Sequence, residues 1–191
     1  MIKSCGDIAR VEYPLFQKED GGSIPTSPLQ FTINKISIRK AKELNQLWHS
    51  KLPIYETGFC EKARICFGAL YEGIFYAIAI WDNPTARLLP QQTWLELKRM
   101  AIAPDAPKNT ASRMIKIMLS IIKKDFPRIT TVISYQDTEV HQGIIYKASG
   151  WKAVNYYAGG NWKRRKRPRP DLNKSFGPKI RWQKEISTGG N

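Results

Sequence analysis

Three polar residues follow a β-branched stretch of the sequence, at a position where side chains can do chemistry. Ser134, Tyr135 and Asp137 lie at the carboxyl end of a strand predicted over 129–135. In open α/β sheets, ligands bind at the carboxyl ends of strands. Asp137 could there orient a base, hold a metal ion or accept a hydrogen bond from an amino group. It could equally cap a helix that begins near Glu139, and the residues alone leave these alternatives open.

Arg99 is the second candidate, because it lies inside a predicted strand over 94–102 that is otherwise rich in apolar residues. Strict alternation divides this strand into one face with Leu95, Leu97, Arg99 and Ala101, and another with Glu96, Lys98, Met100 and Ile102. An arginine that shares a face with apolar residues needs an acidic partner or a ligand. We therefore expect Arg99 to bind a ligand or to form a structural ion pair.

The chain has two histidines, and each could act as a base or as a metal ligand. His49 ends a helix predicted over 39–52, next to the polar pair Ser50-Lys51. His141 precedes Gly143, where it could pack against the protein or cap a helix instead. A set made of His49, Asp137 and His141 could hold a transition metal.

The elements that would position these residues alternate along the chain. Periodicity and turn signals predict strands over 31–38, 64–70, 74–81, 94–102, 129–135 and 151–157, and helices over 39–52, 110–126 and 139–148. The order β-α-β-β-β-α-β-α-β predicts an α/β fold in which a mixed sheet carries helices on both faces. Residues 1–28 hold glycines and prolines without periodicity and are expected to form an irregular arm.

The start of the second helix is a candidate phosphate site. Lys108, Asn109 and Thr110 lie where the strand over 94–102 passes through a short turn into this helix. Free N–H groups and the helix dipole favour an anion at such a point. An ordinary capped helix explains the same residues equally well.

Charge is concentrated near the carboxyl end of the chain. Of 191 residues, 31 are Lys or Arg and 16 are Asp or Glu, which gives a net charge of +15. Ten basic residues and one acidic residue fall between Asn161 and Lys184, interleaved with aromatic residues. Such a segment favours contact with a polyphosphate over a role as a solubilising tail. The expected DNA contacts are Lys163, Arg164, Arg165, Lys166, Arg167, Arg169, Lys179 and Arg181.

Composition excludes several other classes of protein. Hydrophobic residues make up 42% of the chain, which is enough for a core. No apolar run is long enough for a transmembrane helix, and the first residues do not resemble a secretory signal. The three cysteines lack CxxC spacing, so we expect a reduced, cytoplasmic protein without a membrane partner. A homodimer is compatible with these features.

The order of elements resembles the GNAT acyltransferase fold, and two long motifs resemble bacteriophage Mom proteins. The first motif is LELKRMAI over 95–102 followed by DAPKNTASR over 105–113, and the second is SYQDTEVHQGIIYKA over 134–148. WHSK over 48–51 resembles the family's segment that contains His and Ser, without the tyrosine that often separates them. The resemblance spans roughly residues 31–185 and implies a GNAT-like catalytic domain over 29–158 with a basic extension over 159–191.

Mom proteins convert adenine N6 in duplex phage DNA to a methylcarbamoyl derivative, which protects the DNA from restriction. The resemblance therefore implies a DNA-modifying transferase that flips its target base out of the duplex. It implies catalytic roles for His49, Arg99, Ser134, Tyr135, Asp137 and Tyr146, the last as the general acid of GNAT enzymes or else as a core tyrosine. Candidates for stacking on the flipped base are Tyr55, Phe59, Trp81 and Trp94.

The donor implied by the fold is acetyl-CoA or a related thioester. Met100, Ala101 and Ile102 would hold its pantetheine, and Lys108, Asn109 and Thr110 its pyrophosphate. The loop over 107–112 lacks the glycines of ordinary acetyltransferases, which limits how closely its backbone can approach phosphate. Acetyl transfer alone does not give a methylcarbamoyl group, so an iron-assisted step at His49, Asp137 and His141 is a further hypothesis. The alternatives are an acetyl-CoA-dependent N-acetyltransferase of a small amine or protein, and a non-catalytic DNA-binding protein.

Overall fold

The structure, a computed structural model, describes residues 24–49, 52, 65–159 and 177–186. Its elements are a short 3-10 helix η2 (Pro28–Gln30), β1 (Thr32–Ile36), α2 (Ile38–Trp48), β2 (Ile65–Tyr71), β3 (Ile74–Asp82), β4 (Trp94–Ile102), α3 (Thr110–Asp125), β5 (Thr131–Asp137), α4 (Ile144–Ala148), β6 (Lys152–Tyr157) and β7 (Lys179–Glu185). The predicted order of strands and helices is confirmed, with one strand, β7, added at the end. Most of the predicted arm over 1–28 lies outside the described residues.

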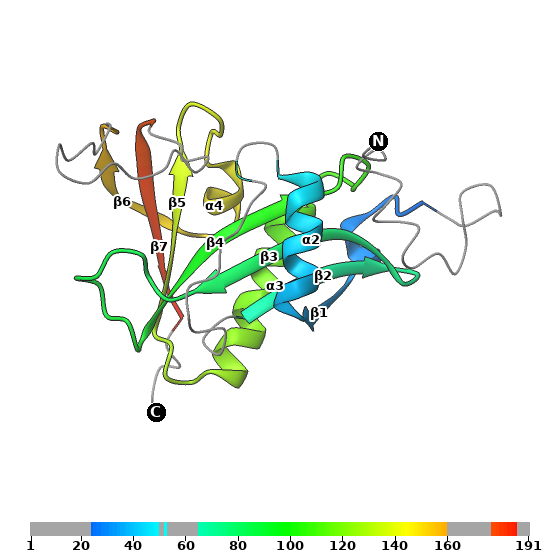
Figure 1. Cartoon of the computed structure of the whole chain (residues 1–191), viewed down its shortest axis with the longest axis horizontal. Helices are drawn as coiled ribbons and strands as arrows, with labels where there is room; N and C mark the ends of the chain where they lie inside the picture. The colour runs from blue at the N-terminus through cyan, green and yellow to red at the C-terminus, as the bar shows by residue number, and fades with distance from the viewer. Residues whose placement is uncertain (1–23, 50–51, 53–64, 160–176, 187–191) are drawn as a thin grey trace.

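The strands form one sheet in the order β1-β2-β3-β4-β5-β7-β6 (Figure 1). Only β4 and β5 are parallel neighbours, and every other pair is antiparallel. The predicted mixed sheet is therefore confirmed. The assignment of 159–191 to an extension outside the domain is wrong for residues 179–185, because β7 is inserted between β5 and β6. Apolar residues alternate with charged ones along this strand, and the abundance of charge concealed the pattern.

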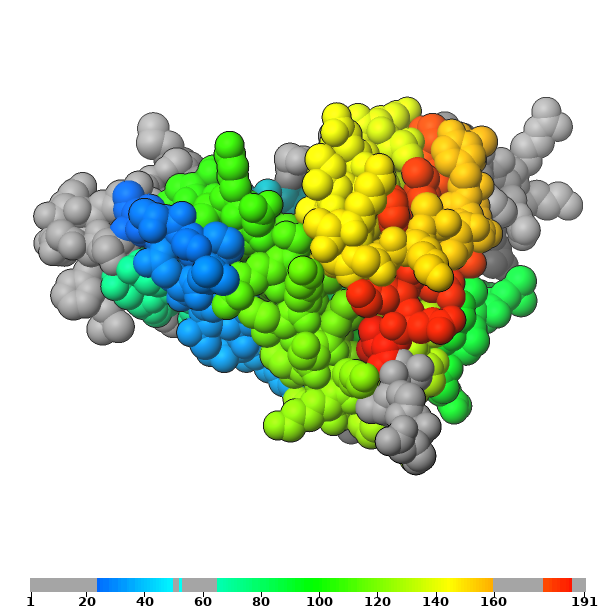
Figure 2. Space-filling model, turned by 180° about the vertical axis from the view of Figure 1, so that it is seen from behind, coloured from blue at the N-terminus to red at the C-terminus, as the bar shows by residue number. Residues whose placement is uncertain are grey.

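Two apolar cores cover the two faces of the sheet. On the face that we call the α2 side, Ala41 and Leu44 of α2 pack against Ile78 and Ile80 of β3. On the opposite face, the α3 side, the apolar residues of α3 pack against β2, β3, β4 and β5. Figure 2 shows this second face, on which α3 and α4 lie over the sheet. The helix α2 packs mainly against β2, β3 and β4, so it covers about one half of its face.

A β-bulge in β4 reverses the predicted alternation of this strand. Ile80 pairs with Arg99 and the next residue, Trp81, pairs with Leu97, so Lys98 is an extra residue. Leu97 therefore packs in the α3-side core, whereas Arg99 lies on the α2 side opposite Ile80. The prediction that Arg99 shares a face with Leu95 and Leu97 is wrong, because alternation was counted without the inserted residue.

The predicted helix over 139–148 is shorter than expected. A turn follows β5, in which Asp137 accepts the Glu139 N–H at Oδ1 (3.0 Å). The helix α4 begins only after Gly143, whose φ of +71° is left-handed. The segment between the turn and α4 has no regular secondary structure and carries His141. Within the described part of the chain, no helix is both long and apolar enough to cross a membrane.

Candidate active site at the fork between β4 and β5

The parallel strands β4 and β5 separate half-way along their length, and we call this point the fork. Their pairing runs from Trp94 with Thr131 to Leu97 with Ser134. Beyond it, β4 continues to Ile102 and β5 continues to Asp137 without pairing with each other. The bulge at Lys98 turns β4 at this position. The backbone edge of Lys98–Ile102 that faces β5 thus lacks a strand partner in the described structure.

A chain of hydrogen bonds closes the fork on the α3 side. Ser134 Oγ donates to the carbonyl oxygen of Leu97 (3.0 Å) and lies 2.9 Å from Tyr146 Oη. Because the single Ser134 hydroxyl proton goes to Leu97, the phenol must donate to Ser134. This arrangement joins β4, β5 and α4 at the last residue pair before the strands part.

Tyr146 is buried in an aromatic cluster at this junction. Its ring stacks on Trp182 of β7 with centroids 5.4 Å apart and meets the edge of Trp151 at 5.5 Å. Burial raises the pKa of the phenol above its ordinary value, and the bond to Ser134 opposes this shift in part. Tyr146 is therefore a neutral donor at physiological pH, which suits both a general acid and a core tyrosine.

On the α2 side, three basic side chains come together next to the fork. His49 is the C-cap residue of α2, Arg99 lies on β4 beyond the bulge, and His141 lies between β5 and α4. The pKa of His49 falls to about 4, mainly through burial and further through the positive charges of Arg99 and His141. Arg99 is fixed in part by its own strand, since Nη1 donates to the Lys98 carbonyl oxygen (2.7 Å). We call His49, Arg99 and His141 the basic cluster.

His49 is held in one tautomer. Its Nδ1 accepts the backbone N–H of Leu52 (3.1 Å), while the carbonyl oxygen of Leu52 accepts from Asn45 Nδ2 (3.0 Å). Nδ1 therefore carries no proton, and the neutral ring bears its proton on Nε2. His49 is a hydrogen-bond donor to a ligand in this state, because its one basic nitrogen is already engaged.

The residues proposed for a metal do not fit that role. The Nδ1 lone pair of His49 is occupied by Leu52, and Oδ1 of Asp137 accepts the N–H of Glu139. Within the described residues, His, Cys, Asp and Glu side chains form no group of three that could hold a metal ion. The hypothesis that iron binds at His49, Asp137 and His141 is therefore not supported.

The loop that carries His141 is fixed by residues that the sequence analysis did not single out. Gln136 Oε1 accepts from Trp182 Nε1 (2.7 Å), and Gln136 Nε2 donates to the carbonyl oxygen of His141. A Cβ at Gly143 would lie 2.5 Å from Gln136 Oε1, so glycine is required by space as well as by φ. The sequence did not indicate that Gln136 contacts Trp182, because this hydrogen bond forms only when β7 pairs with β5.

A second polar group that sequence reasoning missed lies on β4. Glu96 is buried and forms an ion pair with Lys98 (2.9 Å), and its Oε2 accepts the Thr85 N–H (2.7 Å). Burial of the Tyr135 phenol raises its pKa, and the negative charge of Glu96 raises this pKa further. Strict alternation already predicted that Glu96 and Lys98 share a face, and their ion pair shows that the two side chains meet next to the bulge.

The residues predicted to hold the pyrophosphate of the donor lie at the start of α3. Asn109 precedes α3 in the left-handed conformation (φ 67°, ψ 7°), and its side chain does not cap the helix. Thr110 is buried, and its Oγ1 donates to the Pro107 carbonyl oxygen (2.7 Å). Asn109 thus adopts a positive φ in a loop that has no glycine, and Asn tolerates this region better than most residues.

The six predicted catalytic residues are divided between the two sides of the fork. Ser134 and Tyr146 meet on the α3 side, whereas His49 and Arg99 lie on the α2 side. Alternation along β5 places Tyr135 and Asp137 on the α2 side as well. Trp81 is fully buried against α3 and is not free to stack on a base. Tyr55, Phe59 and the basic residues Lys163, Arg164, Arg165, Lys166, Arg167 and Arg169 lie outside the described residues.

Comparison with solved structures identifies the fold. Spermidine N-acetyltransferase from Vibrio cholerae, solved with CoA and spermine, superimposes with a TM-score of 0.58 at 13% identity, over 83% of this chain and 96% of that chain. The ribosomal-protein-S18-alanine N-acetyltransferase of Escherichia coli gives 0.54 at 15% identity, over 84% and 96%. A GNAT-family acetyltransferase from Desulfovibrio desulfuricans gives 0.55 at 10% identity, over 82% and 99%. At these identities the likeness establishes the fold alone.

Comparison of the sequence identifies the family. A search of curated proteins found no match. The profile of the Mom protein family matches residues 30–169, which include α2, the fork and the basic cluster. The chain therefore belongs to the Mom protein family and has the fold of the GNAT acetyltransferases.

Proposed function

We propose that the protein is a transferase that modifies the N6 amino group of adenine in duplex DNA. The observation that carries the proposal is the basic cluster beside the fork, in a Mom-family chain with a net charge of +15. A surplus of positive charge favours a polyanionic substrate and disfavours a cationic amine or basic protein. The product that family membership favours is the methylcarbamoyl derivative, which protects DNA from restriction.

An acyl-CoA-type donor fits the residues at the fork. The edge of Lys98–Ile102 that faces β5 has no strand partner among the described residues, and an amide-containing chain such as pantetheine could pair with it there. The N-terminus of α3, where Asn109 leaves the first turn without a side-chain cap, suits the pyrophosphate. When bound, such a donor would supply an activated carbonyl carbon to the adenine amino group and leave as the free thiol, and the methylcarbamoyl product requires that the transferred group already carry its nitrogen.

The basic cluster would stabilise negative charge on an oxygen of the reacting group. His49 offers its Nε2 proton, and Arg99 adds a permanent positive charge close by. Donors fixed before the reaction are effective because they need no reorganisation as charge develops. His49 therefore acts in this proposal as an electrostatic donor, and its engaged Nδ1 excludes it as the base in this conformation.

Tyr146 would protonate the departing group on the other side of the fork. Its phenol is neutral, since burial raises its pKa, and the bond to Ser134 fixes the direction of its proton. To donate to a ligand, the phenol must leave Ser134 or pass its proton through that hydroxyl. Asp137 lies at the end of β5 on the α2 side, where its Oδ2 could accept from the adenine amino group.

Nucleoside mass spectrometry of DNA co-expressed with the protein tests the proposal. A heavier adenosine that contains an additional nitrogen supports the methylcarbamoyl product, and an N6-acetyl group, which adds no nitrogen, supports plain acetyl transfer to DNA. Acetylated amines or proteins with unmodified DNA would favour an ordinary N-acetyltransferase. Unmodified material of every kind would leave a non-catalytic DNA-binding protein and refute the proposal.

Matched variants separate the site from general effects of charge. Arg99→Gln removes the cation next to His49 and is expected to abolish the modified nucleoside. Arg39→Gln removes the same charge from the exposed start of α2, where the Arg39 side chain is 91% exposed, and is expected to leave modification unchanged. Equal loss in both variants would contradict the assignment of Arg99 to the site.

The predicted role of the basic segment needs an altered experiment. Truncation before Lys163 would also remove β7, which lies inside the sheet and contributes Trp182 to the core. Replacement of Lys163, Arg164, Arg165, Lys166 and Arg167 by Gln in the full chain avoids this loss. We expect weaker binding of duplex DNA and a smaller dependence of affinity on salt.

A further inference from the structure

Half of the α2 side of the sheet is not covered by any helix among the described residues. The helix α2 reaches β2, β3 and β4, so no described helix lies on this side of β5, β7 and β6 (Figure 1). In this half, Tyr135 of β5, Arg181 of β7 and Asn155 of β6 are register partners and form one row across three strands. Asp137, Lys179 and Tyr157 form the neighbouring row. We call these two rows the tyrosine–arginine face.

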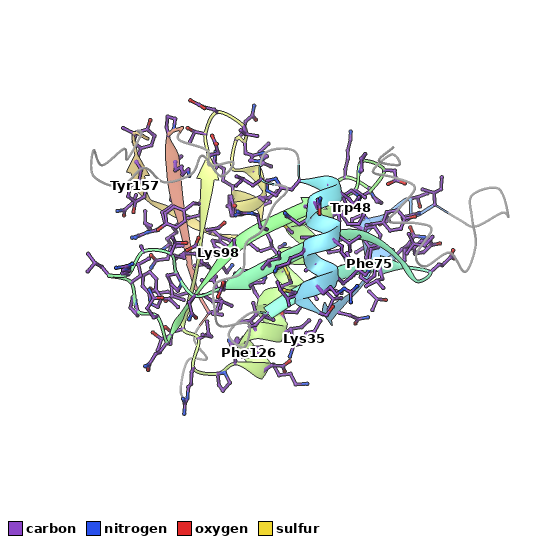
Figure 3. All side chains as sticks on the ribbon, in the orientation of Figure 1. Lys35, Trp48, Phe75, Lys98, Phe126 and Tyr157 are labelled. Carbon is purple, nitrogen blue, oxygen red and sulfur yellow. The ribbon has the colours of Figure 1, made fainter. Side chains whose placement is uncertain are left out.

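Direct contacts show that the side chains of this face point the same way. The rings of Tyr135 and Tyr157 lie 6.0 Å apart between centroids, across β7. Arg181 Nη2 donates to Asn155 Oδ1 (3.3 Å), and the Arg181 side chain also interacts with the Tyr135 hydroxyl. Tyr157 remains 40% exposed at the outer strand of the sheet. Figure 3 labels Tyr157 on β6 and Lys98 on β4, which lies outside this face.

The charges on this face leave a positive surplus. Arg181 contacts an amide and a phenol, both neutral, and within the described residues it forms no ion pair. The buried carboxylate of Glu96 is neutralised by Lys98. Lys179 and Arg181 together therefore outweigh Asp137, the remaining acid of the two rows. A guanidinium held by neutral groups keeps its full charge for an anion.

We infer that the tyrosine–arginine face binds the DNA strand next to the target nucleotide, with a base stacked on Tyr157 and a phosphate on Arg181. Exposed aromatic rings beside arginine are the pattern by which proteins hold nucleic acid strands without reading their sequence. This inference rests on the proposed function and adds the substrate surface to it. Extrusion of the target opens the duplex, and the inference requires that this opening extend to the nucleotide that stacks on Tyr157.

The distance from this face to the fork suits a strand that continues into the site. Asp137, the proposed contact of the adenine amino group, ends β5 three residues beyond the last pair at the fork, and Tyr157 shares its row two strands away. Two strand spacings amount to roughly 10 Å. Stacked nucleotides advance about 3.4 Å along each strand of a duplex, so the Tyr157 contact falls about three nucleotides from the target.

Two adjacent tyrosines provide a matched test. Tyr157 belongs to the face, whereas Tyr156 pairs with Ile180, which packs on the α3 side, and is 66% exposed. Affinity for a fluorescent duplex oligonucleotide is measured by anisotropy for Tyr157→Ala, Tyr156→Ala and the full-length wild-type chain. We expect Tyr157→Ala to weaken binding about tenfold, as for loss of one stacked base, and Tyr156→Ala to have little effect. Equal effects of the two substitutions, or none, would overturn the inference.

Arg181 is tested by the salt dependence of the same affinity. Arg181→Gln should reduce the slope of log affinity against log salt by about one, the loss of one phosphate contact, and Arg181→Lys should restore the slope. Thermal unfolding of each variant identifies a folding defect, and Tyr157→Phe, which keeps the ring, must then retain binding. A slope that is unchanged in Arg181→Gln would remove the phosphate contact from the inference.

Failure of this inference is distinguishable from failure of the proposed function. If wild-type protein modifies co-expressed DNA and Tyr157→Ala binds duplex normally, the function stands and the surface assignment is wrong. If wild-type protein binds duplex through Tyr157 and Arg181 but adenine stays unmodified, the surface stands and the transferase proposal is wrong. If wild-type protein does not bind duplex DNA, both are overturned.

Discussion

The hydrogen bonds that close the fork allow a quantitative prediction about Tyr146 and Ser134. Tyr146→Phe removes the donor to Ser134 Oγ and leaves the Ser134 bond to Leu97 intact. A typical buried hydrogen bond contributes about 1 kcal/mol, so we expect the free energy of unfolding to fall by that amount. Ser134→Ala removes both bonds and leaves the buried phenol without its partner, which should cost about 2–3 kcal/mol.

The double variant separates this account from simple addition. With both hydroxyls absent no buried phenol is left unpaired, so the combined change should cost about 2 kcal/mol, below the sum of the single changes. Equilibrium unfolding in urea, followed by tryptophan fluorescence, gives all four free energies. The reasoning is refuted if Tyr146→Phe costs as much as Ser134→Ala, or if the two changes add.

The same variants decide the role of the phenol in the reaction. Tyr146→Phe is expected to fold, because its ring keeps the contacts with Trp151 and Trp182. Loss of DNA modification with a stability loss of only about 1 kcal/mol would assign the phenol to proton transfer. Unchanged modification would make Tyr146 a core residue that closes the fork.

Three further predictions concern stability. Because the pKa of His49 falls from 6.5 to about 4 on folding, stability should be full above pH 6.5 and decline by about 1–2 kcal/mol, after allowance for solvent screening, as pH falls to 4. His49→Asn, which keeps an acceptor for Leu52, should flatten this decline in urea titrations across pH. Gly143→Ala should cost more than about 2 kcal/mol, since φ is +71° and Cβ would lie 2.5 Å from Gln136 Oε1; a normal melting temperature would contradict this. Asn109→Gly should be neutral or slightly stabilising in thermal melts, because φ is 67°, and a clear loss would show that the Asn109 side chain contributes.

Most elements of the fold could be predicted because local patterns determine them. The apolar stripe of α3 and the β-branched run of β5 are read correctly from periodicity alone. The strand β7 was not predicted, because Lys179, Arg181 and Lys184 make its segment look like a solvated tail. Lys179 and Arg181 lie on the α2 side, whereas Ile180 and Trp182 face the α3-side core and Lys184, on that same side, donates to the carbonyl oxygen of Ser149. The charged residues thus concealed a strand that is inserted between β5 and β6.

The site could be predicted as a set of residues but not as an arrangement. Arg99, Ser134 and Asp137 were found because motifs and strand ends mark them. Their division between the two sides of the fork depends on the bulge at Lys98, which no local pattern announces. The tautomer of His49 depends on the backbone of Leu52, and such a contact cannot be read from residue types.

The single inserted residue in β4 has a consequence for how this protein can change. Odd-numbered residues of β4 lie on the α3 side before Lys98 and on the α2 side after it, and even-numbered residues change sides in the opposite sense. Deletion of Lys98 would join Arg99 directly to Leu97 and restore regular alternation, so Arg99 would stay opposite Ile80. The strand would lose its local bend and the ion pair between Lys98 and Glu96, whereas the side on which Arg99 lies would not change.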